Sequence, residues 1–187
     1  MTPTPFRRLS VPLTVLVLLT GGVFAAGDKD LERLPGYVDP APFLALEDED
    51  GELVSITIPG TLLKALAGPF GKESELAGLI GGLEWVGATI VGTEDPERIR
   101  KARELFDSTE KRLLREGWER LVVVREEGST VKVLILNTEK TIAGLVVMVI
   151  DDEEIVFTNI AGVIDLEKLG ALAEEMKIPG LENLGEN

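Results

Sequence analysis

The chain has 187 residues, of which 33 are acidic and 19 basic, and it contains neither cysteine nor histidine. These absences exclude disulfides and the usual zinc and copper ligands, so a metal site would depend on carboxylates, which prefer harder ions. The formal net charge of −14 opposes binding to a phosphate backbone, so we expect no nucleic-acid partner.

The first 25 residues have the pattern of a secretory signal peptide. Arg7 and Arg8 precede a mainly apolar run over residues 9–19, and Val23-Phe24-Ala25 supplies small residues at the spacing that a signal peptidase needs. We therefore predict an exported protein, periplasmic or secreted. The alternative is a membrane-anchored protein with an uncleaved segment, because residues 9–26 approach the length that spans a bilayer core. Membrane contact is expected only through this segment.

The remaining chain has the length of one domain. An extended lead-in is predicted before it, because Pro35, Pro40 and Pro42 disfavour a helix. The last residues follow Pro179-Gly180 and are expected to fray. The predicted organisation is a signal peptide at 1–25, a lead-in at 26–46, a single domain at 47–178 and a flexible tail at 179–187.

One long helix dominates the first half of the domain. It begins after Asp95, an N-cap residue followed by Pro96, and it ends at Gly117. Arg103 and Asp107 are expected to pair on its solvent side. Its predicted apolar stripe consists of Ile99, Ala102, Phe106 and Leu113. The shorter elements predicted before it are a strand at 53–58, glycine-limited helices at 61–67 and 74–79, and a strand at 85–91.

Four strands joined by short polar turns follow the long helix, at 120–125, 131–136, 142–150 and 155–160. Such short connections require antiparallel neighbours, so this half is predicted to be a meander. The run 145–150 is apolar at every position, which predicts a central strand covered on both faces. In the strand at 131–136, apolar residues alternate with Lys132, which indicates that only one face is covered.

A last helix is predicted after Asp165, with Leu166, Leu169, Leu172 and Met176 facing inward. The fold class is therefore predicted to be α+β. It consists of a mainly antiparallel sheet of about six strands, including the C-terminal four-strand meander, with helices packed on it.

No stretch matches a catalytic signature in the right structural context, so we expect a non-enzymatic protein without a cofactor. Two Ser-x-x-Lys matches, at 108–111 and 129–132, have the spacing of serine acyl-enzymes, but neither serine begins a helix in a cleft. The acidic runs at 47–51 and 151–154 admit weak divalent cation binding, although neither completes a calcium loop.

Three groups of residues are candidates for core packing or for binding a partner. Trp85 and Trp118 each stand at the start of a strand and are expected in the core. Asn159 interrupts an apolar strand, so its amide needs partners, either backbone groups or a bound molecule. Tyr37 and Asp39 lie in the proline-rich lead-in, which either straps across the sheet or presents an extended recognition segment.

Several motifs together resemble a family of exported bacterial proteins, domain of unknown function 4252. The resemblance covers roughly residues 30–172 and implies an envelope or secreted location, with no established activity to carry over. The motifs are Leu34-Pro35-Gly36-Tyr37-Val38-Asp39, Ile58-Pro59-Gly60 with the leucine-rich helix after it, Gly117-Trp118, the run 142–147 and the run 156–165.

The leading hypothesis is a non-enzymatic interaction module of the cell envelope that binds another envelope protein through a sheet face or edge. The alternative is a carrier of an apolar small molecule or lipid, held between the sheet and the helices of 61–82. A carboxylate-dependent hydrolase is a third hypothesis, which would require two convergent acidic side chains with shifted pKa values.

Overall fold

The computed structural model describes residues 31–47, 51–71, 74–126, 128–138 and 141–165. The predicted signal peptide, the predicted helix after Asp165 and the predicted tail lie outside these residues. So does the middle of the acidic turn at 47–51.

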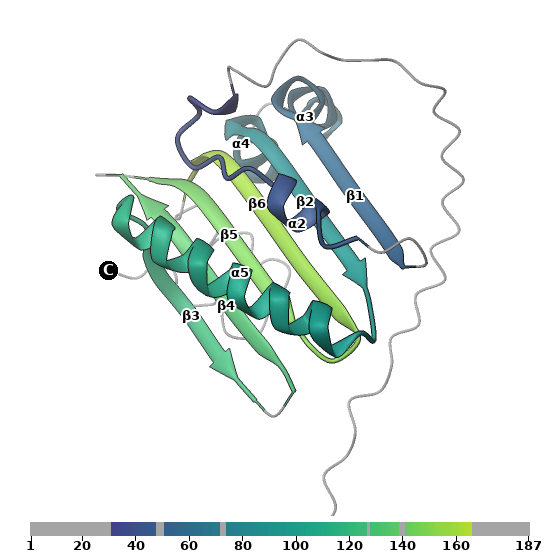
Figure 1. The fold of residues 1–187 in the computed structure, drawn as a ribbon. Helices are drawn as coiled ribbons and strands as arrows, with labels where there is room; N and C mark the ends of the chain where they lie inside the picture. The colour runs from purple at the N-terminus through teal and green to yellow at the C-terminus, as the bar shows by residue number, and fades with distance from the viewer. Residues whose placement is uncertain (1–30, 48–50, 72–73, 127, 139–140, 166–187) are drawn as a thin grey trace, which may run out of the picture.

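A six-stranded antiparallel sheet organises the described residues, in the order β1-β2-β6-β5-β4-β3 (Figure 1). The last four strands along the chain are sequential neighbours in the sheet, which confirms the predicted meander. The pairing of β2 with β6 joins the first two strands to it. The strands are β1 (Glu52–Pro59), β2 (Leu83–Gly92), β3 (Glu119–Arg125), β4 (Thr130–Asn137), β5 (Ile142–Ile150) and β6 (Glu154–Ile164).

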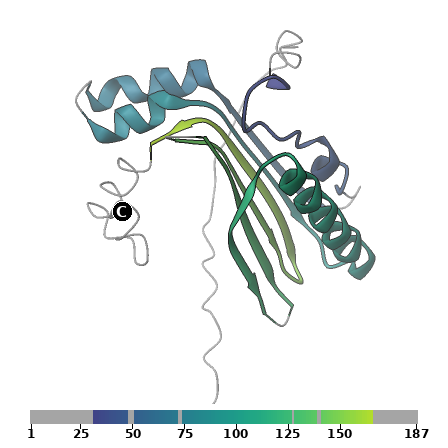
Figure 2. The same cartoon turned by 90° about the vertical axis from the view of Figure 1, so that its left-hand side faces the viewer.

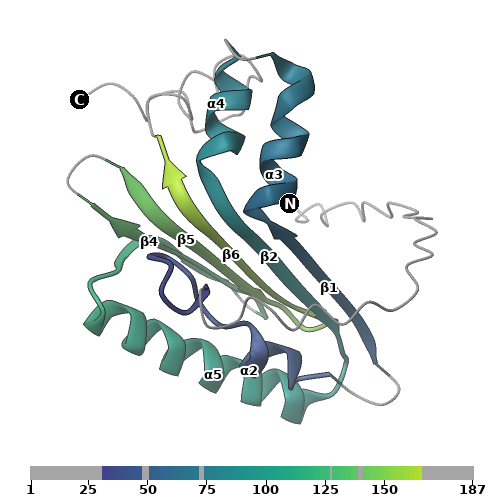
Figure 3. The same ribbon diagram turned by 90° about the horizontal axis from the view of Figure 1, so that it is seen from above.

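The helices lie at two places on this sheet. Helix α5 (Pro96–Arg115) and the short α2 (Ala41–Leu44) cover one face, which we call the helical face. Two further helices, α3 (Gly60–Ala67) and α4 (Glu75–Gly82), project from one end of the strands, with the 3₁₀ turn η1 (Gly68–Phe70) between them (Figures 2 and 3). The predicted α+β class is confirmed.

Helix α5 has the predicted ends and the predicted stripe. Asp95 Oδ1 accepts a hydrogen bond from the Glu97 N–H at 3.0 Å, and Gly117 ends the helix with φ +92°. The stripe residues are all buried, so this face packs on the sheet: they are Ile99, Ala102, Phe106 and Leu113. Each large side chain buried in this way contributes about 1.5–3 kcal/mol.

The core lies between α5 and the helical face. Phe43 from α2 stacks on Phe157 from β6, with ring centroids 3.8 Å apart, and meets Phe106 from α5 edge-on. Trp118 is buried in the same cluster, and Trp85 is buried nearby on β2, as predicted for both. The lead-in therefore completes the core by inserting Phe43 between α5 and β6.

The prediction of a lead-in without a helix was wrong at α2. Pro42 lies in the first turn of this helix, where a backbone N–H has no intrahelical acceptor, so proline is tolerated there. Asp39 caps the same turn, because its Oδ1 accepts a hydrogen bond from the Ala41 N–H at 2.9 Å. The segment before α2 remains free of strand pairing and crosses the helical face.

Strand β5 is central, as predicted, but its two faces differ. Val146 and Met148 on the helical face are completely buried, whereas Val147 and Val149 on the other face are only half-buried. The prediction that both faces are covered was therefore wrong for the described part of the chain. Strand β4 has one covered face, as the alternation predicted, and it is the face of Lys132, which turns toward α5 and leaves Val131 and Val133 on the opposite face.

Candidate functional site

The face of the sheet opposite α5, which we call the open face, is lined by apolar side chains across all six strands. The strand register aligns them in three rows, and Thr158 is the one polar residue in the first two. Row 1 is Val124, Val131, Val149, Val156, Ile90 and Val54. Row 2 is Val122, Val133, Val147, Thr158, Ala88 and Ile56. Row 3 is Glu119, Ile135, Leu145, Ile160, Val86 and Ile58.

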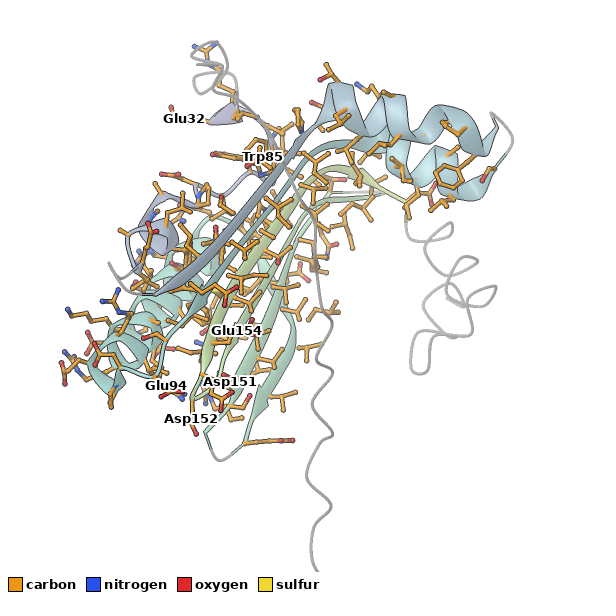
Figure 4. All side chains as sticks on the ribbon, turned by 90° about the vertical axis from the view of Figure 1, so that its right-hand side faces the viewer. Glu32, Trp85, Glu94, Asp151, Asp152 and Glu154 are labelled. Atoms are coloured by element: carbon orange, nitrogen blue, oxygen red, sulfur yellow. The ribbon has the colours of Figure 1, made fainter. Side chains whose placement is uncertain are left out.

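Among the described elements, only α4 packs over part of the open face. Leu79 of α4 joins a cluster with Ile135 and Ile160 of row 3. Rows 1 and 2 lie farther along the strands, and Figure 4 shows side chains of this face projecting into the space away from α5. At the outer strands, Ile56, Val122 and Val124 are each more than 40% exposed. Contiguous apolar surface of this kind is typical of an interaction site.

Strand β3 is an edge strand with no buried residue. Leu121 is 53% exposed, and Val122, Val123 and Val124 are each 41% exposed. The pairing with β4 is irregular between Arg120 and Val122, so Leu121 is bulged. An apolar edge strand offers a row of backbone donors and acceptors beside apolar side chains, which is the template for adding another strand.

Acidic residues border the end of the open face that lies farthest from α4. Asp151 and Glu154 are grouped there, whereas Glu94 and Asp152 line a hollow with Arg100 and Arg103 of α5 (Figure 4). Burial raises the pKa of Glu154 above its ordinary value, and the negative charges of Asp151 and Glu52 raise it further. The described residues provide no group of three acidic side chains arranged for a metal ion. The negative charges of Asp151, Glu154 and Glu52 favour cationic groups on a molecule that contacts this end of the open face.

Asn159, a predicted binding residue, lies on the helical face and holds the lead-in. Its Oδ1 accepts a hydrogen bond from the Val38 N–H at 3.0 Å, and its Nδ2 donates to the Gly36 carbonyl oxygen at 2.8 Å and the Leu145 carbonyl oxygen at 3.3 Å. The side chain is 1% exposed. The sequence analysis left open whether this amide binds backbone groups or a bound molecule, and its hydrogen-bond partners in the structure are backbone groups.

The lead-in contacts the sheet so closely that only glycine fits. Gly36 has φ +85°, and a Cβ atom there would lie 2.0 Å from the Ala143 carbonyl oxygen. A Cβ at Gly144 would lie 2.5 Å from the Cα of Gly36 and 2.7 Å from the Trp118 ring. The glycines in the two sequence motifs therefore meet each other, and Asn159 from a third motif fixes the same contact.

The other two predicted binding residues also serve the lead-in. Tyr37 is half-buried and packs edge-on against Trp85, with ring centroids 5.3 Å apart. Asp39 is exposed and caps α2. The structure thus gathers Tyr37, Asp39 and Asn159 along the strap formed by the lead-in, on the face opposite the open face.

A buried ion network under α5 was missed by the sequence interpretation. Lys132 is 1% exposed, and its Nζ donates to Glu110 Oε2 at 2.8 Å and to Asp107. Arg120 from β3 donates to the other Glu110 oxygen. Asp107 thus pairs with Lys132 instead of Arg103, which donates to the Gly128 carbonyl oxygen at 2.9 Å.

The network shifts the titration of both carboxylates downward. The hydrogen bond from Lys132 lowers the pKa of Asp107 below its ordinary value. Burial by itself would raise the pKa of Glu110, but the hydrogen bonds from Lys132 and Arg120 outweigh it and lower that pKa. The ammonium hydrogens of Lys132 are directed at carboxylates, so the network ties α5 to β4 and does not present a free nucleophile.

Residues 47–172 match the family described as Domain of unknown function (DUF4252). The chain belongs to this family. The resemblance predicted from the sequence is therefore confirmed. The matched range of this DUF4252 protein contains Gly144 and Asn159, which seat the lead-in, and extends beyond the end of β6. Neither the curated proteins nor the solved structures include a match to the chain.

Within the described residues of this DUF4252 protein, no helix combines the length and apolar character needed to cross a bilayer.

The sequence analysis did not predict the open face or the β3 edge as candidate binding surfaces. Their signal was present in two places, the apolar run at 121–124 and the alternation in β4. The alternation predicted one covered face without identifying it, and the structure covers the face of Lys132.

Proposed function

We propose that this protein is an exported, non-enzymatic interaction module of the cell envelope. Its partner is an envelope protein that adds an extended segment to β3 and lays apolar side chains over the adjoining outer part of the open face. The observation that carries the proposal is the β3 edge, where four consecutive apolar residues are at least 41% exposed beside strand backbone that pairs with no other described strand.

A peptide segment fits this surface better than a lipid chain. The outer edge of β3 requires backbone hydrogen-bond partners, which a strand provides and an acyl chain does not. Val122 and Val124 on β3 continue directly into Val131 and Val133 on β4, so side chains of an added strand would lie beside an apolar surface already formed. Natural edge strands are usually protected by charge or covering elements, and these four residues have no charge.

The charge of the surface further restricts the partner. Glu154 on β6 and Glu52 on β1 lie three and five strands away from β3, so they favour lysine or arginine in the part of the partner that extends across the open face. The net charge of −14 gives the same preference at longer range. We therefore expect a partner strand that alternates apolar side chains and has basic flanks, with complex formation that weakens at high salt.

The experiment is capture of the partner from the envelope fraction of the native host, followed by native mass spectrometry of the complex. Wild type is compared with V122K/V124K, which adds two charges on β3. The matched control is S55K/T57K, which adds two charges at exposed positions of the opposite edge strand β1. We expect one protein at fixed stoichiometry with wild type and control, and none with V122K/V124K. Retention by V122K/V124K, with unchanged thermal unfolding, would refute the use of this edge.

A second candidate function, carriage of an apolar small molecule, has one observation in its favour. A cavity of about 670 Å³ lies between the lead-in and the start of α3, within the usual volume of a ligand site. Leu34 and Trp85 line it, and the buried indole N–H of Trp85 has no hydrogen-bond partner among the described residues.

The same mass spectrum separates the two functions. A stoichiometric small-molecule adduct, lost on denaturation and on L34K but retained by the exposed control L62K, would support the carrier. A protein partner with no such adduct would support the interaction module.

A further inference from the structure

The described chain leaves the sheet on the open face, next to α4. Strand β6 ends at Ile164, whose side chain is 6% exposed and belongs to the cluster with Leu79 of α4, Ile135 and Ile142. Residues 31–47 occupy the opposite face, where Gly36 rests on Gly144. The chain that follows Ile164 therefore starts beside the uncovered rows.

The residues that follow Ile164 have the sequence of an amphipathic helix. Asp165 is an N-cap residue, and the apolar side chains recur at spacings of three and four. The side chains opposite this stripe include charged residues. The stripe consists of Leu166, Leu169, Leu172, Ala173 and Met176, and the charged residues are Glu167, Lys168, Glu174 and Glu175. A stripe of this kind is stable only against another apolar surface.

We infer that residues 165–176 form a helix that packs on the inner part of the open face, over row 3 and the edge of row 2. About twelve helical residues span roughly 18 Å. Along β6, Thr158 of row 2 lies roughly 20 Å from Ile164. The helix thus ends close to Val147 and Thr158, which are paired neighbours in row 2.

Two observations favour this segment over a second copy of the chain as the occupant. The family match extends to residue 172, so the first half of the segment is part of the matched domain although it follows β6. A second copy seated on row 3 would have to fit beside α4 and would leave the apolar stripe of both chains without a surface. The inference does not require the proposed function, because row 1 and the β3 edge stay open to a partner.

The test uses the absence of cysteine from the chain, which makes any engineered pair the sole source of an intrachain disulfide. The test variant is M176C/V147C, and the matched control is E175C/V147C, in which the first cysteine has nearly the same reach but points about 100° away around the helix. M176C is also paired with V133C and with T158C to allow for a sideways shift. Cross-linking of the full-length monomer under mild oxidation is followed by intact mass.

A docked helix holds one sulfur near the sheet, so we expect at least one M176C pair to oxidise about tenfold faster than its E175C counterpart. Equal rates for M176C and E175C at all three sheet positions would overturn the inference, because an undocked segment brings both cysteines to the sheet equally. Slow oxidation of every pair would overturn it as well. Partner capture on β3 is read separately, so failure of one proposal leaves the other unaffected.

Discussion

The two faces of the sheet are built from the same strands and similar aliphatic residues, yet they are used differently. On β5, Val146 is completely buried under α5, whereas its neighbour Val149 on the open face is half-buried. The helical face also accommodates polar groups, Lys132 and Asn159, each with specific partners. Apolar content alone therefore does not identify the core face. The covering helix decides which residues lose contact with water.

The largest expected effect comes from breaking the ion network of the helical face. K132A removes the positive charge between Asp107 and Glu110, leaves the buried Glu110 with Arg120 alone and empties the space of a fully buried side chain, so it should destabilise the fold by about 3–5 kcal/mol. Chemical denaturation measures the change. K101A removes a lysine from the exposed side of α5 outside the network and is the control, with an expected effect within about 0.5 kcal/mol. Equal losses in the two variants would contradict the importance of the network.

The next effect tests the strap on the helical face. N159A leaves the Val38 N–H and the Gly36 carbonyl buried without the amide, so a loss of about 2–4 kcal/mol is expected. Hydrogen exchange should also show faster exchange of the Val38 amide. T158A, the adjacent residue on the open face, should change stability by less than about 1 kcal/mol. A Val38 amide that stays protected in N159A would show that the strap is held by other contacts.

A third test compares the two faces directly on β5. V146T places a hydroxyl where no water reaches and should cost about 1–3 kcal/mol. V149T places the same hydroxyl at a half-buried position of row 1, where the cost should stay below about 0.5 kcal/mol. Thermal and chemical unfolding of both variants measure the difference. If V149T proves as costly as V146T, row 1 is covered in the native protein and is not an open surface.

The smallest expected effect is the pH dependence of the stability of the fold. It should have one sign for the carboxylates of the helical face and the opposite sign for Glu154 on the open face. The lowered pKa values of Asp107 and Glu110 contribute stability above their ordinary values of 3.8 and 4.5, and this stability is lost as the pH falls through the lowered values. The raised pKa of Glu154 contributes stability below 4.5 that is lost as the pH rises through the raised value.

Unfolding measured between pH 3 and pH 7 should therefore show a shallower acid loss in E110Q and a small gain near neutral pH in E154Q. Burial is the main cause of the raised pKa of Glu154, so only the smaller part of the gain that comes from the charges of Asp151 and Glu52 should diminish at high salt. An E110Q profile that parallels wild type would indicate that the network does not govern acid unfolding.

Much of the fold was predictable because its signals are local. The cap at Asp95, the stop at Gly117 and the spacing of Ile99, Ala102 and Phe106 define α5 from neighbours within a few turns. Short polar turns likewise required the meander. The helix at 41–44 was missed because proline was treated as a general helix breaker, although its position in the first turn removes that penalty.

The candidate surface was less predictable, because alternation along a strand defines two faces without saying which one a helix will cover. The alternation of Val131 and Val133 with Lys132 predicted one covered face, and the structure covers the face of Lys132 rather than the face of the valines. The carboxylates that receive Lys132 come from α5, more than 20 residues earlier in the chain. Their relation to β4 appears only when the helix crosses the sheet.

Most of the elements, the antiparallel order of the meander and the family could be inferred from the sequence, since hydrogen bonding within turns, capping and side-chain periodicity act between close neighbours. The packed structure was needed to establish which face α5 covers, that Lys132 is buried between two carboxylates, and that Gly36, Gly144 and Asn159 meet. Those outcomes depend on which distant surfaces exclude water from each other, and that choice is a property of the packed chain rather than of any segment.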